Sequence, residues 1–157
     1  MPLKVRVRNA VRAPLRAAFL KDVISAAVEE PALAGRLGPD PGREMTVRIT
    51  GDRELRRLNA SFLGLDEVTD VLSFPGGDSD AYLGDLAISW PAVARQAQSF
   101  GHAPQVEAAL LAVHGLLHLL GWDHVTPAEA AEMEALTQAC LGRAGLPAVG
   151  GRLAGSQ

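Results

Sequence analysis

The chain has 157 residues, which is the usual length of one domain. Hydrophobic residues make up 48% and charged residues 21% of it, a composition that excludes a disordered chain and a coiled-coil rod. The formal net charge is −3, so a site for a polyanion would need a local basic patch or a bound cation. Cys140 is the single cysteine, which excludes an intrachain disulfide and a cysteine-based zinc site.

Hydrophobic periodicity predicts four strands and five helices. The strands are expected at 4–8, 45–50, 70–74 and 83–89, the last two forming a hairpin. The helices are expected from 14 to about 29, after 52, and at 90–101, 104–120 and 126–142. Asp52 is expected to cap the second helix, and 35–43, rich in glycine and proline, to form a loop. This order predicts an α+β fold with a small mixed sheet.

We expect residues 1–144 to form this one domain and residues 145–157, with four glycines, to be a flexible tail. The longest uncharged stretch, 108–122, is shorter than the roughly 20 apolar residues of a membrane span and contains two histidines. No apolar segment follows the basic residues near the N-terminus, so a signal peptide is not expected. The cytoplasm is therefore the predicted location.

Three of the four histidines lie in one run of eleven residues, at positions 114, 118 and 124. His114 and His118 are four residues apart, so a helix places them on the same face. Gly121 is expected to end that helix and allow His124 to return toward the same point. Three neutral imidazoles and a water are the ligands of an open, catalytic zinc site.

Two other interpretations of the histidines remain open. They can be polar residues on a solvated helix face, although the neighbouring leucines favour burial and buried imidazoles need partners. They can also form a structural zinc site with Asp123 or Asp85 as a fourth ligand. The spacing is similar to that of metzincin proteases, but Gly115 stands where those enzymes have the glutamate that acts as general base. This difference disfavours peptide hydrolysis.

The sequence resembles the YbeY family of bacterial endoribonucleases over roughly residues 46–141. The resemblance rests on four blocks: Leu58-Asn59, the run from Thr69 to Pro75, Leu83-Gly84-Asp85-Leu86, and the histidine run 114–124. It implies a zincin-like fold and one zinc ion per chain, held by His114, His118 and His124. It also implies cleavage of single-stranded RNA in the 3′-end maturation of small-subunit rRNA and in ribosome quality control. The small ribosomal subunit and assembly factors are the partners that it implies.

The sequence departs from the family at a position that usually carries an arginine for RNA binding or catalysis. Leu63 stands there, and Leu65 stands where a lysine is common. Basic residues elsewhere can supply the phosphate contacts: five near the N-terminus, Arg6, Arg8 and Arg12 among them, and a cluster formed by Arg53, Arg56 and Arg57. A solvated charged face is the alternative for these side chains.

Asp70 and Asp85 are the two carboxylates expected to orient a histidine or the attacking water. Asp70 can instead fix the start of its strand, and Asp123 is expected to shape the turn before His124. The sequence thus predicts a zinc-dependent endoribonuclease that hydrolyses phosphoester bonds in single-stranded RNA. The alternative is a ribosome-assembly factor with a mainly structural zinc ion and little nuclease activity, which Leu63 favours.

Overall fold

A computed structural model describes residues 3–39, 42–63, 69–77 and 81–147 of the chain. The elements of this part, in chain order, are β1 (Leu3–Asn9), α1 (Ala17–Ala27), α2 (Pro31–Leu37), β2 (Arg43–Thr50), α3 (Asp52–Leu58), the π-helical turn η1 (Asn59–Leu63), β3 (Val71–Pro75), β4 (Tyr82–Ser89), α4 (Trp90–Phe100), α5 (Pro104–Leu119) and α6 (Pro127–Arg143).

The four strands form one mixed sheet in the order β1-β2-β4-β3. β1, β2 and β4 are parallel, whereas β3 pairs with β4 as an antiparallel hairpin. β3 is therefore an edge strand of the sheet that the described residues form. The mixed sheet and the hairpin confirm the fold class predicted from the sequence.

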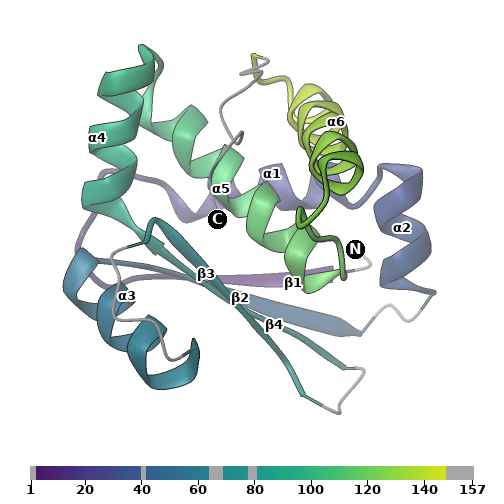
Figure 1. The fold of residues 1–157 in the computed structure, drawn as a ribbon, viewed down its shortest axis with the longest axis horizontal. Helices are drawn as coiled ribbons and strands as arrows, with labels where there is room; N and C mark the ends of the chain where they lie inside the picture. The colour runs from purple at the N-terminus through teal and green to yellow at the C-terminus, as the bar shows by residue number, and fades with distance from the viewer. Residues whose placement is uncertain (1–2, 40–41, 64–68, 78–80, 148–157) are drawn as a thin grey trace.

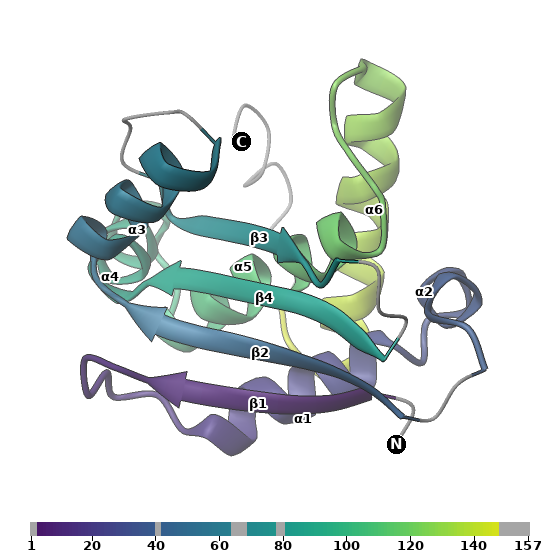
Figure 2. The same ribbon diagram turned by 90° about the horizontal axis from the view of Figure 1, so that it is seen from below.

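The two faces of the sheet are covered differently. Helices α1 and α5 pack on one face, with α6 packed against these two helices, and α3 lies on the other face (Figures 1 and 2). The main hydrophobic core lies between the sheet and the first group of helices, and α5 runs through it with every residue from Val106 to Leu117 buried. A second, smaller apolar cluster of Leu55, Leu72 and Ala87 fixes α3 to the opposite face. The rest of that face has no helix over it in Figure 2.

The structure corrects three details of the sequence prediction. α2 is a sixth helix in a segment that was expected to end one helix and begin a loop; Pro31 occupies its first turn, where the missing N–H costs nothing. α1 begins at Ala17 and not at Pro14. Gly51 is the N-cap of α3, and Asp52 makes no capping bond to its own helix. The capping box at Thr126 is confirmed, with bonds of 3.0 and 3.1 Å to Glu129.

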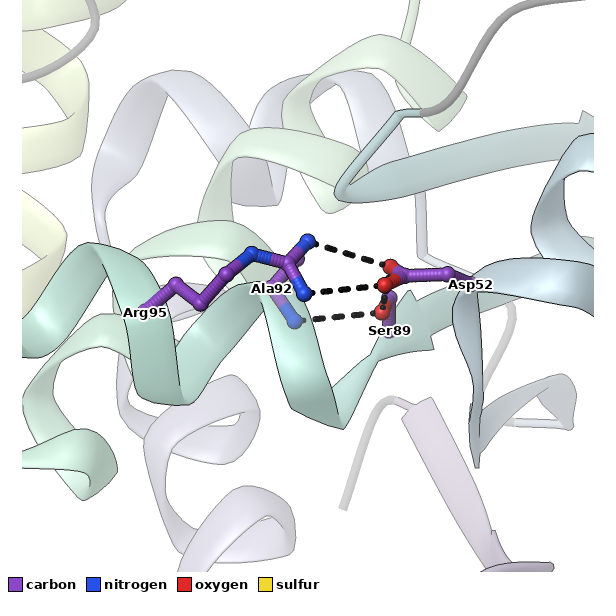
Figure 3. Close-up of polar contacts among 4 residues, drawn as sticks. All are labelled: Asp52, Ser89, Ala92 and Arg95. Atoms are coloured by element: carbon purple, nitrogen blue, oxygen red, sulfur yellow. Dashed lines mark hydrogen bonds and ion pairs between the residues drawn. The ribbon is translucent and has the colours of Figure 1, made fainter.

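Asp52 instead joins α3 to α4 (Figure 3). Its carboxylate accepts hydrogen bonds from the Ser89 hydroxyl at 2.6 Å and from the Arg95 guanidinium at 2.9 Å. Ser89 is also the N-cap of α4 and accepts from the Ala92 N–H at 3.2 Å. One carboxylate thus holds the starts of both helices together at the end of β4.

No helix in the described part of the chain is long and apolar enough to cross a membrane.

Candidate functional site

The three predicted histidines come together at the end of α5. His114 and His118 lie one turn apart on this helix, with their Nε2 atoms 3.1 Å apart. Gly121 has a φ of 98°, a conformation that favours glycine, and it turns the chain back after the helix. His124 then approaches the other two, and the potential ligand atoms of all three lie within 4.8 Å of one another.

The surroundings of the cluster suit a metal ion. His124 Nε2 is buried and has no hydrogen-bond partner among the described residues, which is costly for a polar atom unless something binds it. Burial lowers the pKa of His118, so this imidazole stays neutral, the form that binds metals. Two nitrogens bound to one tetrahedral zinc ion are about 3.3–3.4 Å apart, close to the 3.1 Å between His114 and His118. Within the described ranges no carboxylate joins the cluster.

The loop that carries His124 is held by contacts from two other helices. The buried indole of Trp122 donates a hydrogen bond of 2.7 Å to Glu132 on α6. Arg36 of α2 places its guanidinium carbon 3.7 Å from the centre of the Trp122 rings and donates to the Leu120 carbonyl at 3.3 Å. No sequence pattern indicates Arg36, because it is 84 residues from Leu120 and lies in a helix that was not predicted.

Asp123 acts as predicted from its place in the motif. Its carboxylate accepts a hydrogen bond of 2.8 Å from the backbone N–H of His124. This bond orders the turn immediately before the third histidine.

Gly115 faces the sheet and not the histidines. A Cβ atom here would lie 2.7 Å from a methyl group of Leu86 and 3.3 Å from the Ser73 hydroxyl. The Ser73 hydroxyl also donates to the Gly115 carbonyl at 3.2 Å. The glycine therefore lets α5 pack closely against β3 and β4, and no glutamate side chain fits at this position without displacing them.

A cavity of about 700 Å³ lies on the opposite side of this contact. Its apolar wall consists of Leu58, Phe62 and Phe74, from α3, η1 and β3. Phe62 is 67% exposed and meets Phe74 edge to face, with ring centres 5.4 Å apart. Ser73 also lines the cavity, so the cavity wall touches the residue next to His114.

The polar side of the cavity comes from the strands. Thr46, Arg48 and Asp85 share the face of β2 and β4 that points away from α5, and Arg8 of β1 lies near them. Arg48 forms an ion pair with Glu54 of α3, with an Nε–Oε1 distance of 2.5 Å. Asp85 accepts a hydrogen bond of 2.5 Å from the Tyr82 hydroxyl.

The two predicted catalytic carboxylates lie away from the histidine cluster. Asp85 is exposed on the cavity side of the sheet. Asp70 immediately precedes β3, where its backbone carbonyl accepts from the Ser89 N–H at 2.9 Å. This bond agrees with the structural alternative for Asp70, a residue that fixes the start of its strand.

The predicted basic residues divide into two groups. Of the N-terminal group, Arg8 lines the cavity, Arg6 pairs with Glu44 at 3.5 Å, and Arg12 has a φ of 53° in the loop after β1. The α3 cluster of Arg53, Arg56 and Arg57 is exposed, and none of the three lines the cavity.

Leu63 ends η1, and the position of Leu65 lies outside the described residues.

Comparison with known proteins agrees with the motifs. A sequence model of the family "Endoribonuclease YbeY" matches residues 8–145. The endoribonuclease YbeY of Aromatoleum aromaticum is 41% identical over 145 residues, covering 92% of this chain and 90% of that protein. The one from Gloeobacter violaceus is 57% identical over 90 residues, covering 52% of this chain and 46% of that protein.

The fold is also found in a solved structure. The solution structure of TM1509 from Thermotoga maritima matches with a TM-score of 0.57 and 22% identity, covering 88% of this chain and 89% of that one. The family match spans nearly all of the described residues and includes the histidine run. The resemblance seen in the sequence is therefore confirmed, and the chain belongs to the endoribonuclease YbeY family.

Proposed function

We propose that this protein is a zinc-dependent endoribonuclease that cleaves single-stranded RNA. The observation that carries the proposal is the convergence of three buried or half-buried imidazoles at the end of α5, with no carboxylate among the potential ligands that the described residues bring together. Three histidines leave one position of a tetrahedral zinc ion open for water or substrate. Family membership supports RNA as the substrate.

His114, His118 and His124 would hold one zinc ion per chain. When bound, the ion supplies a water of low pKa and polarises a phosphoryl oxygen. The residues of the chain prepare this site: burial keeps His118 neutral, and Asp123 orients the backbone at His124. Arg36 and Glu132 fix Trp122, and with it the loop that ends in His124.

The biological role that we propose follows the family. The protein would act in the 3′-end maturation of small-subunit rRNA and in ribosome quality control, in the cytoplasm, with the small ribosomal subunit and assembly factors as partners. Residues 1–144 would form the nuclease domain. Among basic side chains, Arg8 and Arg48 of the cavity and the cluster of Arg53, Arg56 and Arg57 would contact RNA phosphates.

A second function, a ribosome-assembly factor with a mainly structural zinc ion, is favoured by Leu63 at the position of the family's arginine. The two functions predict different results for zinc-loaded protein. A nuclease cleaves single-stranded RNA and loses this activity with His118→Ala, whereas an assembly factor binds zinc but leaves RNA intact.

The experiment combines metal analysis with cleavage assays on the same preparations. We expect one zinc ion per wild-type chain, loss of the ion in His118→Ala, and cleavage of RNA but not of peptides. His102→Gln is the matched control, because His102 lies outside the cluster and pairs with Glu107 at 2.7 Å. The proposal is contradicted if the zinc-loaded protein cleaves peptides, or if it does not cleave RNA.

A further inference from the structure

The metal site leaves the cavity on the open face of the sheet without a role. We propose that it binds one nucleobase of the RNA strand, stacked on Phe62. This inference rests on the proposed nuclease function and assigns a second contact to the same substrate. The cavity and the histidines lie on opposite sides of the β3–β4 hairpin, joined through Ser73 and Gly115.

The aromatic wall provides a surface for stacking. Phe62 is 67% exposed, whereas Phe74 is half-buried against the apolar cluster that fixes α3. The edge-to-face contact between them, with planes at 65°, holds Phe62 in place. Aromatic side chains that stack on single-stranded bases strengthen binding about fivefold or more per base, so an exposed phenylalanine at this place favours a flat ligand.

The polar floor excludes a phosphate group from the centre of the cavity. The Asp85 carboxylate would repel a phosphate, but it can accept a hydrogen bond from an N–H group on the edge of a base. The Tyr82 hydroxyl lies 2.5 Å from one oxygen of Asp85 and 2.9 Å from the Thr46 hydroxyl. These bonds fix the carboxylate beside the apolar wall, so the cavity combines a stacking surface with an acceptor.

The phosphates that flank the base have cationic partners at the rim. Arg8 is exposed, and it forms no ion pair or side-chain hydrogen bond with any of the described residues. Arg48 donates two hydrogen bonds to the Glu54 carboxylate, from Nε at 2.5 Å and from Nη2 at 3.3 Å. Arg8 therefore offers a cation to a phosphate beside the apolar ring site, whereas the charge of Arg48 is balanced by Glu54. A ring site with a cation at its rim fits a base with its backbone better than an apolar peptide.

The shared wall gives the path of the strand. Ser73 lines the cavity and donates to Gly115, the residue after His114. β3 is an edge strand of the sheet (Figure 2). An RNA strand that crosses this edge can therefore reach the cavity on one side and the histidines on the other. The cavity would thus position the RNA at a fixed distance from the cleaved bond.

The test compares two probes of equal charge: a short single-stranded RNA and the same oligomer with abasic ribose at every position. Affinity is measured by fluorescence anisotropy at several salt concentrations, and a gel after each titration checks that the probe is intact. We expect wild-type protein to prefer the probe with bases. Phe62→Ala should weaken binding of that probe at least about fivefold, leave the abasic probe unaffected, and keep the same salt dependence because no charge is lost.

Three variants make the result specific. Phe62→Trp should retain the preference for bases. Phe100→Ala is the matched control, because Phe100 is also an exposed phenylalanine, 55% accessible, but lies on α4 outside the cavity. Arg8→Gln should weaken both probes and lower the log–log salt slope by about 0.7.

The possible failures are distinguishable. If wild-type protein cleaves RNA but Phe62→Ala binds both probes as wild type does, the nuclease function stands and the base site is wrong. The base site is also wrong if Phe100→Ala weakens binding of the probe with bases as much as Phe62→Ala does. It is wrong as well if Phe62→Ala weakens binding of the abasic probe to the same extent as that of the probe with bases. If the wild type neither binds nor cleaves RNA, the proposed function is wrong and the base site is rejected with it, which would leave a protein segment as the occupant of the cavity.

Discussion

Arg36→Ala tests whether a side chain of α2 prepares the metal site on α5. The arginine lies over the Trp122 rings and donates to the Leu120 carbonyl, and both acceptors belong to the turn between His118 and His124. A cation–π contact of an exposed arginine contributes about 0.5–1 kcal/mol. The hydrogen bond adds roughly 0.5 kcal/mol, at the low end of its range because it is 3.3 Å long. The substitution should therefore cost about 1 kcal/mol.

This free energy bears on zinc binding as well as on folding. If it holds the His124 loop in the conformation that binds zinc, its loss raises the zinc dissociation constant by at most about fivefold. The melting temperature should fall by roughly 2–4 °C. The assays are competition with a zinc chelator of known affinity and thermal unfolding of the zinc-loaded and zinc-free protein.

Two variants separate the loop from general stability. Arg36→Lys keeps the charge but loses the planar group that stacks on the indole, so it should lie between wild type and Arg36→Ala. Arg143→Ala removes another exposed arginine, which lies on α6 and forms an ion pair with Glu30 at a distance of 2.5 Å. This variant should leave zinc affinity unchanged, because Arg143 does not contact the His124 loop. Our reasoning is refuted if Arg36→Ala lowers the melting temperature but binds zinc as tightly as wild type.

Three further predictions concern packing, acid stability and the metal. In denaturant titrations, Gly84→Ala should destabilise the protein by about 2–3 kcal/mol, because a Cβ would lie 2.4 Å from the Phe74 carbonyl oxygen. The control is Gly142→Ala, which should not destabilise the protein because the space around Gly142 is open. The hydrogen bond from Arg95 lowers the pKa of Asp52, so its contribution is present above about pH 4 and lost as the pH falls through the lowered value. Asp52→Asn should thus melt below wild type at pH 7 by a margin that disappears in acid; a constant margin contradicts this. His118→Ala should melt at a lower temperature than zinc-loaded wild type, and equal melting temperatures would show that zinc does not stabilise the fold.

The sequence predicted the features that depend on neighbouring residues. The spacing of His114 and His118, followed by Gly121, fixes a helix, its end and a return of the chain within eleven residues. The structure brings these three histidines together as expected, because the geometry of one helical turn needs no information from elsewhere. The hairpin of β3 and β4 was predictable because its two strands are neighbours in the sequence.

The features that the sequence did not predict depend on distant partners. Asp52 has the residue type and position of an N-cap, but Ser89 and Arg95, which lie near it only in the folded chain, bind its carboxylate instead. α2 was missed because Gly35 and the flanking prolines indicate a loop, whereas two buried leucines stabilise the helix by packing into the core. The cavity could not be found, since its walls come from four strands, α3 and η1.

Gly115 connects the local and the distant features. In the sequence it shows that the glutamate of a metzincin protease is missing after the first histidine. In the structure it is the position where α5 approaches the sheet so closely that a Cβ would meet Leu86 at 2.7 Å. The same absence of a side chain that removes the peptidase base thus brings Ser73, and with it the wall of the cavity, against the helix that carries His114. A larger residue here would require the Leu86 and Ser73 side chains to shift, so the close packing of α5 on the sheet depends on this glycine.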